Sequence, residues 1–543
     1  MKKIYSIAVI TCFTFLNFLS CSKDSEILDQ KEEPKEQQEE EQEEEQKGTD
    51  KEQPNASSYT FNEPQVIGNT FYLDPVNGSI NGDGSQTNPW GKLQEVVEAK
   101  LIETYKHETN NDSSSPLVPL NEGAPVKGGD RLILKDGYHG QLEISNFYFN
   151  DWLTIEAAQG ETPTLARLHL NGLVKNVYLK NLNIIRDSYQ GTQNYWEATE
   201  MQRNSRTLLY IASQSFHGKA SDVKISGLTA KVSEDVVSWS RQDWEDRYAS
   251  GIRLRSTENI EIVNSRFENI GFGLVADYFP NHTTIFNSVF KNYCRDGIRL
   301  TAHDFHFENN LVTGVVNINT SADNSINFHY DAFQAYSRDE NNQNAGTGNG
   351  IIRNAIIRGN SFIGKSDLPL DNGFLVNQDV QGIGCFDGFF DNFIIENNVV
   401  SVSHHHGITL LGATNTTIAN NTVIDSDPND DLYPWIRINN HKNGSASKDC
   451  VIANNIITQG AHVEGDNVLE KNNHIIGSGN QNDIFTLFLD PDNYDFHLLK
   501  NSTVDQTIID AGAIINTLHS TKIDKDGKAR TANPDLGAYE RVD

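Results

Sequence analysis

The stretch Asp296-Gly297-Ile298-Arg299-Leu300 is one copy of a motif that recurs in the second half of the chain. Apolar residues alternate with small or polar ones in each copy, a pattern typical of a β-strand. We therefore expect the copies to be strands of one parallel sheet. The other copies are Ser250-Gly251-Ile252-Arg253-Leu254, Phe272-Gly273-Leu274-Val275-Ala276, Asp331-Ala332-Phe333-Gln334-Ala335, Gln381-Gly382-Ile383-Gly384-Cys385, His406-Gly407-Ile408-Thr409-Leu410 and Trp435-Ile436-Arg437-Ile438.

A second motif follows each copy: an apolar residue, a variable one and a pair drawn from Asn, Ser and Gly. Asn264, Asn287 and Asn309 belong to successive copies and are 23 and 22 residues apart. Asn397 and Asn420 repeat the spacing of 23. Repeats of about 20 to 50 residues indicate a solenoid, in which each unit packs on its neighbours.

The asparagines and the alternation favour a β-solenoid over a helical one. Asparagine tolerates the left-handed conformation at a tight bend, and its amide can hydrogen-bond to the copies above and below. A helical solenoid would show a 3.6-residue apolar period instead. The fold class we predict is all-β, a single right-handed parallel β-helix with an N-terminal helical cap and a C-terminal cap. The handedness follows from the general crossover preference of parallel strands.

Aligning the copies assigns a direction to each position. The third and fifth positions are apolar, so we expect them to point inward and the second and fourth to point outward. The second position is glycine in nearly every copy, which predicts a shallow strip on the surface where an extended polymer can lie. The alternative is that small residues merely ease the stacking of coils. The fourth position holds Arg253, Val275, Arg299, Gln334, Gly384, Thr409 and Arg437.

The N-terminus has the features of a lipoprotein signal. Lys2 and Lys3 precede an apolar run that is too short for a membrane span and ends at Cys21. This ending resembles a bacterial lipoprotein signal, which implies residues 1–20 as signal peptide and lipidation of Cys21. The acidic residues that follow resemble the export tag of Bacteroidota surface lipoproteins. We therefore expect an outer-membrane, lipid-anchored chain exposed at the cell surface, with no other membrane contact.

We expect residues 21–58 to be a disordered acidic tether. The segment is mostly Glu, Gln and Lys, and these side chains cannot form a buried core. Between Lys23 and Glu52 there are 14 acidic and 5 basic residues, which supply −9 of the net charge of −30. The remainder is still acidic, which argues against nucleic acid as a partner. Three further cysteines lack metal-site spacing, and Cys385 falls in an inward column. We expect a monomer.

The first part of the folded chain carries a family resemblance. Phe71-Tyr72-Leu73-Asp74 predicts a first strand, and residues 93–101 have helical spacing suited to covering the open end of a solenoid. Together with Gly128-Gly129-Asp130-Arg131-Leu132-Ile133-Leu134, this opening resembles pectate-lyase-like β-helix proteins, including the chondroitinase B and alginate lyase family. We assign residues 59–130 to the N-terminal cap and first strands, 131–480 to the β-helix and 481–543 to the C-terminal cap.

Chemically active side chains concentrate on successive copies. Neighbouring parallel strands are about 4.8 Å apart, so these side chains would lie within reach of one or two sugar units. The candidate catalytic residues are His329, Asp331, His406, Arg437 and Lys442. The candidate substrate-binding residues are Arg253, Arg299, Gln334, Gln381, Trp435 and His441. Asp296 and Asp387 are candidate metal ligands, with calcium as the possible ion.

The reaction we expect is β-elimination of an acidic, uronic-acid-containing polysaccharide. The proton on C5 becomes removable once the neighbouring carboxylate is neutralised, by arginine or by calcium. Arg299 and Arg437 are suited to this neutralisation, Lys442 or His406 to the role of base, and His329 to that of acid. Lysine and arginine have these roles in the family that the chain resembles.

Three alternatives stay open. Two carboxylates drawn from Asp296, Asp331 and Asp387 can hydrolyse a glycosidic bond as acid and base. A uronate C5-epimerase would share the proton abstraction. A non-catalytic surface glycan-binding protein would need aromatic platforms, for which the segment 234–248, with Trp239 and Trp244, is a candidate unless these residues anchor a loop.

Overall fold

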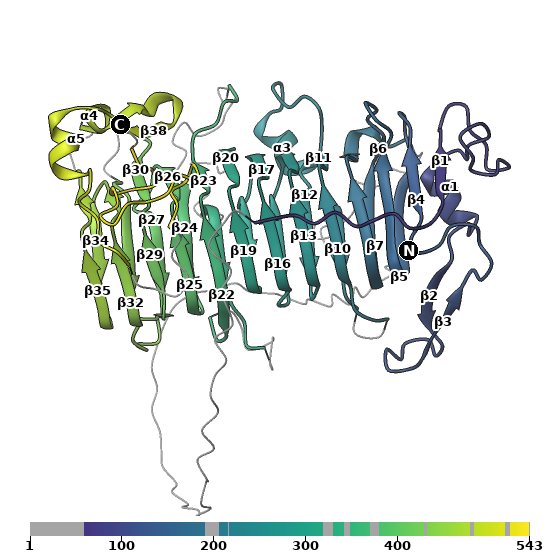
Figure 1. Cartoon of the computed structure of the whole chain (residues 1–543), viewed down its shortest axis with the longest axis horizontal. Coiled ribbons are helices and arrows are strands. Elements are labelled where there is room, and N and C mark those ends of the chain that lie inside the picture. Colours follow the sequence, from purple (N-terminus) through teal and green to yellow (C-terminus); the bar gives the residue numbers. More distant parts are fainter. Residues whose placement is uncertain are drawn as a thin grey trace, which may run out of the picture. The chain divides into compact units, whose positions relative to one another are not determined.

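The computed structural model describes residues 59–190, 206–214, 217–318, 329–340, 348–369, 380–427, 432–477, 483–515 and 522–541. The proposed signal peptide, the tether and Cys21 lie outside these residues. These described residues all belong to one compact unit. It is a right-handed parallel β-helix, as predicted (Figure 1).

The β-helix has three faces, which we call the first, second and third sheets. A typical coil contributes one strand to each face. The third sheet has 11 strands, and the other two join into one sheet of 23. They join because β5 (Gln141–Ala157) and β7 (Arg167–Lys180) continue through the corner between them and pair along both halves.

The first sheet carries the predicted motif copies. Beyond the first halves of β5 and β7, its strands are β9 (Thr207–Ala212), β12 (Ser250–Arg255), β15 (Leu274–Asp277), β18 (Ile298–Leu300), β21 (Tyr330–Tyr336), β24 (Val380–Asp387), β27 (His406–Leu411), β31 (Trp435–Asn439) and β34 (Gly460–Val463).

The second sheet begins with β1 (Thr70–Leu73) and β4 (Arg131–Leu134), before the later halves of β5 and β7. Its further strands are β10 (Ser221–Ser226), β13 (Glu258–Val263), β16 (Asn281–Phe286), β19 (His303–Glu308), β22 (Ile351–Arg358), β25 (Phe389–Glu396), β28 (Ala413–Thr414), β29 (Thr417–Ala419), β32 (Lys448–Ala453) and β35 (Asp466–Lys471).

The third sheet closes the coil. Its strands are β6 (Thr164–Leu165), β8 (Asn183–Ile185), β11 (Thr229–Lys231), β14 (Arg266–Ile270), β17 (Val289–Tyr293), β20 (Leu311–Val315), β23 (Ser361–Ile363), β26 (Val399–Val402), β30 (Thr422–Asp425), β33 (Ile456–Ile457) and β36 (His474–Ile475).

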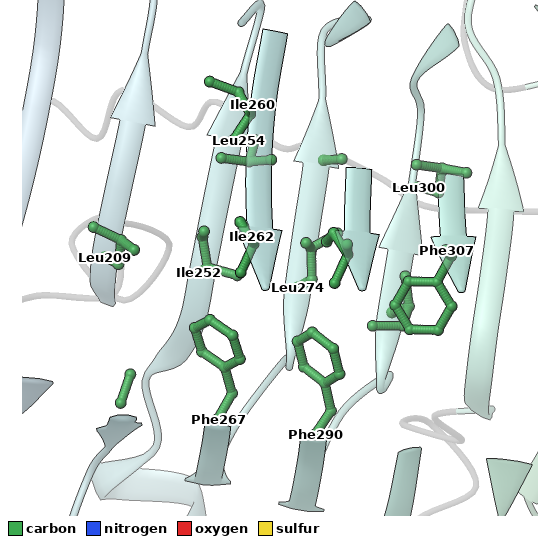
Figure 2. Close-up of a cluster of buried hydrophobic side chains, with 14 of the residues drawn as sticks. Leu209, Ile252, Leu254, Ile260, Ile262, Phe267, Leu274, Phe290, Leu300 and Phe307 are labelled. Carbon is green, nitrogen blue, oxygen red and sulfur yellow. The ribbon is translucent and has the colours of Figure 1, made fainter. Parts of the chain in front are cut away.

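The core is a stack of apolar side chains inside the coils, drawn from all three sheets. Figure 2 shows Ile252 and Leu274 of the first sheet facing Phe267 and Phe290 of the third. The third and fifth positions of the motif are fully buried, which confirms that they point inward, and Cys385 is among them.

The second position also points inward, so the prediction of an outward glycine strip is wrong. A Cβ on Gly251 would lie 3.0 Å from the Phe267 ring, and one on Gly297 would lie 2.5 Å from the Val312 side chain. Both partners belong to the third sheet. The chain turns a corner just before each strand of the first sheet, and two successive residues therefore face the interior. The corner leaves little room for a side chain, so the position holds glycine, or alanine in the copy with Ala332.

The asparagines behave as predicted. Asn264, Asn287 and Asn309 have φ of 51°, 49° and 55°, in the left-handed region. The following position forms a buried ladder, in which the Nδ2 of Asn360 donates to Asn398 and that of Asn398 donates to Asn421, each at 3.0 Å. These bonds satisfy polar groups that the bend would otherwise leave unpaired.

Both ends of the β-helix carry additional structure. The helix α1 (Leu93–Glu98), shorter than the predicted 93–101, packs Leu93 and Val96 into the core beside β2 (Thr104–His107) and β3 (Leu117–Leu120). The C-terminal part consists of α4 (Ile484–Leu487), β37 (Phe488–Asp490), β38 (Asp495–Leu498) and α5 (Ser502–Thr507), which surround a second apolar cluster with residues of the third sheet. Within the described residues, no helix is long and apolar enough to cross a membrane.

The loop before β12 contains α3 (Arg241–Arg247). Trp244 is fully buried there and packs edge-on against Trp239, which is also buried. These two indoles therefore anchor the loop and are not exposed platforms for a sugar.

Candidate functional site

Two outward-facing rows of side chains cross the strands of the first sheet. The fourth position of the motif forms row B, whose members are aligned in register on successive strands. Row B runs Tyr210, Arg253, Val275, Arg299, Gln334, Gly384, Thr409, Arg437 and His462. The predicted outward orientation of this position is confirmed.

The first position of the motif forms row A, which lies beside row B. Asp331 on β21 is paired in register with Gln381 on β24. Asp296 precedes β18 and His406 begins β27, so four successive coils place two acids, an amide and an imidazole in line. Neighbours in such a row are about 4.8 Å apart.

The two acids of row A form a buried pair. Asp296 is 6% exposed and Asp331 is 1% exposed. The backbone N–H of Asp331 donates to Asp296 Oδ1 (3.3 Å), and Gln334 Nε2 donates to Asp331 Oδ2 (2.8 Å). The other oxygen of Asp331 has no hydrogen-bond partner among the described residues and lies beside Gly384, where a Cβ would be 2.7 Å from it.

Burial and their closeness to each other raise the pKa values of both acids by different amounts. Burial raises the pKa of Asp296 to about 6, against the opposing effect of the Arg299 guanidinium. Burial and the charge of Asp296 raise the pKa of Asp331 well above its usual value. Two neighbouring carboxyls in a low dielectric cannot both ionise easily, so the pair holds a proton near neutral pH.

Arg299 is the cation nearest to this pair. Its Nε is 3.9 Å from Asp296 Oδ2, and that nitrogen has no hydrogen-bond partner in the part of the chain that the structure describes. The guanidinium also lies 5.0 Å from the ring centre of Tyr336 and 5.6 Å from that of Phe272. It is about one-third exposed, at 38% of its side chain, so a ligand can reach it.

His406 is the centre of a second group, which we call the histidine cluster: His404, His405, His406, Trp435, Arg437 and His462. The ring of His406 lies between His404, stacked at 5.0 Å, and Phe386, edge-on at 4.8 Å. Its Nδ1 is 3.0 Å from Thr409 Oγ1. Burial, followed by the charges of His404 and Arg437, lowers the pKa of His406 to about 3. His406 is therefore neutral at neutral pH.

Trp435 ties the histidine cluster together. Its Nε1 donates to Thr409 Oγ1 (3.2 Å), and His405 stacks on its ring at 5.0 Å. His462 packs edge-on against it at 4.8 Å, and the Arg437 guanidinium lies 5.8 Å from its ring centre. Among the described residues, Arg437 has no carboxylate partner. The group therefore presents positive charge beside a neutral imidazole.

His329 lies just before β21, exposed, and links the two groups. Its charge acts on both Asp296 and His406. The structure therefore brings together Asp296, Arg299, His329, Asp331, Gln334, Gln381, His406, Trp435 and Arg437 of the predicted residues.

Three predicted residues lie elsewhere. Lys442 follows the end of β31, and its Nζ donates to Asp387 Oδ1 (2.7 Å) at the end of β24. His441, in the same turn, is buried and stacks on Phe389 at 4.3 Å. Trp435, which is paired with His406, is the first residue of β31, and Asn439 is its last. The four residue steps between them span about 13 Å. Lys442 and His406 therefore stand at opposite ends of the strands and do not form one catalytic group.

Arg253 is at the other end of row B, and Asp277 on the neighbouring strand β15 binds it. The Nε of Arg253 donates to Asp277 Oδ2 (3.0 Å), and its terminal nitrogen also contacts that oxygen. Because this guanidinium already has a carboxylate partner, Arg299 and Arg437 are better placed for an anionic ligand.

The predicted calcium pair does not fit a metal site in this arrangement. Asp296 lies in row A on the coil of β18, whereas Asp387 ends β24 and is bound to Lys442. In the part of the chain that the structure describes, there is no group of three or more His, Cys, Asp or Glu side chains that could hold a metal ion. We therefore assign no step of the chemistry to calcium.

Sequence reasoning missed Thr409 as the partner of His406, and Tyr336 and His462 as neighbours of the two arginines. His462 had a usable signal, because Gly460-Ala461-His462-Val463 repeats the spacing of the motif with histidine at the row B position. Thr409 was in row B but carries no charge, so nothing in the sequence distinguished it.

Comparisons with known proteins support the fold. No protein-family model matches the sequence, and no curated protein matches it. A solved structure described as the complex of XylC with xylose matches with 8% identity over 87% of this chain and 98% of that chain, at a TM-score of 0.51. At this identity the likeness shows the fold alone.

Other solved structures are more distant. Pectate lyase Pel9A matches with 13% identity over 88% of this chain and 98% of that chain, at a TM-score of 0.41. The A-module of the Azotobacter vinelandii mannuronan C-5 epimerase AlgE4 matches with 15% identity over 64% and 88%, at 0.34. The structural neighbours are thus lyases, an epimerase and glycoside hydrolases with a β-helix fold.

Proposed function

We propose that the chain is a polysaccharide lyase that cleaves an acidic, uronic-acid-containing polysaccharide by β-elimination on the first sheet. The observation that carries this proposal is the juxtaposition of a neutral His406 with Arg437, which has no carboxylate partner among the described residues. This combination offers a cation for the uronate carboxylate and a base for the neighbouring C5 proton.

The contacts of His406 explain how the site could bind the uronate carboxylate and take up the C5 proton. When its Nδ1–H donates to Thr409, its Nε2 carries the free lone pair and can accept the C5 proton. Arg437 neutralises the carboxylate and so stabilises the charge that develops as the proton leaves. A bound carboxylate also offsets the cations around His406, which raises the pKa of the imidazole and strengthens it as a base.

Two further residues complete the proposed site. His329, near both His406 and Asp296, is placed to protonate the leaving oxygen. Arg299 offers a second cation four strand spacings along row B from Arg437, with Gln334, Gly384 and Thr409 between them. That separation is about 19 Å, which suits an extended polyanion with a carboxylate on each arginine.

A second function, glycoside hydrolysis, has one observation in its favour. Asp296 and Asp331 lie on adjacent coils with unequal proton affinity, as an acid and base pair requires. Their burial weighs against it, because a 1% exposed Asp331 cannot contact a sugar without movement. A C5-epimerase would use the same His406 and Arg437, and differs only in where the proton returns.

Incubation with alginate, pectate, ulvan and glycosaminoglycans tests the proposal. A lyase generates the ultraviolet absorbance of a conjugated uronate double bond, and His406→Ala abolishes it. New reducing ends without that absorbance, lost in Asp296→Asn, would establish hydrolysis. Solvent deuterium in the polymer without chain cleavage would establish an epimerase, and binding without any reaction would leave a glycan-binding protein.

We further propose that Cys21 is lipidated and that the enzyme is a monomer held at the outer membrane and exposed at the cell surface. The signal-like N-terminus and the acidic tether support this placement. Metabolic labelling with a fatty acid, lost in Cys21→Ala, tests the anchor.

A further inference from the structure

A second groove crosses the second sheet. It has a volume of about 370 Å³, within the range of small-molecule sites. Its floor is a row of outward side chains aligned in register on β10, β13, β16 and β19: Lys224, Glu261, Thr284 and His306. Three strand spacings make this floor about 14 Å long, which is room for a short stretch of a linear chain.

The corner of the coil forms one wall of the groove. Asp222, Asn259, His282 and Asp304 stand there on the same four coils, and all four have φ between 46° and 54°. The left-handed conformation turns the backbone at this corner, and the four polar side chains form a second row beside the floor. Trp152, on β5, lines the groove at one end.

The N-terminal segment 59–63, which we call the strap, holds the floor in place. Figure 1 shows the first described residues, in purple, crossing the strands of this face. Lys224 Nζ donates to the backbone oxygen of Asn62 (2.8 Å) and lies 2.9 Å from Glu261, which also accepts from the Tyr59 hydroxyl. Tyr59 itself packs on Phe286 at 5.3 Å. The floor is therefore organised before any ligand arrives.

We propose that this groove binds a neutral oligosaccharide. The hydroxyls of a sugar can donate to the carboxylates and accept from the amide, ammonium and imidazole groups, and a C–H face can lie on the Trp152 ring. Apart from Trp152, the residues that line the groove are polar, and the strands beneath it are paired on both sides, so these strands offer no open edge to a peptide.

The charge of the groove selects against acidic chains. Asp222, Glu261 and Asp304 face one lysine, which already lies against Glu261. His282 lies 3.6 Å from Asp304 and so already faces a carboxylate. A uronate or sulfated sugar would meet like charges here, in contrast to the Arg437 and Arg299 groove on the first sheet. The two grooves therefore take sugar chains of different charge.

Calorimetric titration of the full chain with cellohexaose, xylohexaose and mannohexaose, beside a galacturonate hexamer, tests this site. We expect one of the neutral hexasaccharides to bind. Thr284→Arg, which fills the middle of the floor from an outward position, and Trp152→Ala should each raise the dissociation constant at least tenfold. Thr313→Arg, an outward threonine on the third sheet, is the matched control and should not change it.

A variant in the proposed site on the first sheet serves as a second control. Arg437→Ala should leave binding of the neutral hexasaccharide intact, whether or not the chain is a lyase. Absence of binding by all three neutral hexasaccharides would overturn the proposal. Binding that survives Thr284→Arg but is lost in Arg437→Ala, or a galacturonate hexamer that competes for the second-sheet groove, would overturn it as well.

Discussion

His406 and Arg437 lie on neighbouring strands, β27 and β31, and the guanidinium is one of the charges that keep the imidazole neutral. Neither residue has a carboxylate partner among those that the structure describes. Arg253 and Lys442 differ in this respect, because Asp277 binds the first and Asp387 the second. His406 and Arg437 therefore place a neutral base beside a cation that an anionic ligand can use.

Removing the imidazole should remove the reaction. In His406→Ala we expect kcat to fall by about 100-fold to 10,000-fold, the usual contribution of a general base, with little change in KM. Initial rates of double-bond formation on the preferred polymer measure the effect. His107→Ala, a histidine on β2 outside both grooves, is the control. An active His406→Ala enzyme would contradict the role of His406.

The cation should act on binding and on the transition state together. Arg437→Ala should lower kcat/KM by more than Arg437→Lys does, because lysine keeps the positive charge but not the paired donors. Steady-state kinetics on the same polymer provide the comparison, with Arg353→Ala, an exposed arginine bound to Glu340 on the second sheet, as the control. Equal losses in the alanine and lysine variants would mean that charge neutralisation is not what Arg437 provides.

The pH dependence of kcat/KM should separate the two candidate reactions. His406 must be unprotonated to act as a base, and its pKa of about 3 means that this requirement fails only as the pH falls toward 3. Hydrolysis with Asp296 as the base would instead lose activity as the pH falls through about 6, where that carboxylate takes up a proton. A profile that stays flat from pH 7 to 5 in the wild type favours the lyase. A fall centred near 6 that disappears in Asp296→Asn contradicts it.

Much of the fold was predictable because each coil of a solenoid carries the same sequence pattern. The inward Ile and Leu columns, the left-handed asparagines and their ladder are local consequences of residue type, and each copy of the motif restates them. The outward row from Arg253 to Arg437 could be aligned for the same reason, since strands in register bring equivalent positions together.

The errors arose where the chain leaves regular alternation. A strict period of two assigned the glycines of the motif to the surface, but the corner before each strand turns two successive residues inward. In the same way, Lys442 and Asp387 were grouped with the site because of their nearness in sequence to Arg437 and Gln381. Asp387 is the last residue of β24 and Lys442 follows the end of β31, so both lie at the opposite end of the strands from His406.

The corner glycines give a direct test of that correction. In Gly273→Ala the new methyl group would meet the Phe290 ring at 2.9 Å and the backbone oxygen of Gly297. We expect a loss of about 1 to 3 kcal/mol in the free energy of unfolding, as for other overpacked cores. Urea denaturation measures it, with Thr313→Ala on the outside of the third sheet as the control. A loss no larger than that of the control would mean that this position has free space.

The buried acid pair predicts a stability that changes with pH. Because the pKa of Asp331 is raised on folding, the folded state binds the proton more tightly than the unfolded state does. Its contribution to stability is therefore present below the ordinary pKa of aspartate and is lost as the pH rises toward the raised value. Asparagine has no carboxyl group to ionise, so Asp331→Asn lacks this pH-dependent loss. The variant should therefore gain stability relative to the wild type as the pH rises from 4 to 8. Thermal unfolding at several pH values, compared with the exposed Asp466→Asn, checks the trend, and parallel curves for the wild type and Asp331→Asn would show that Asp331 is ionised in the folded protein.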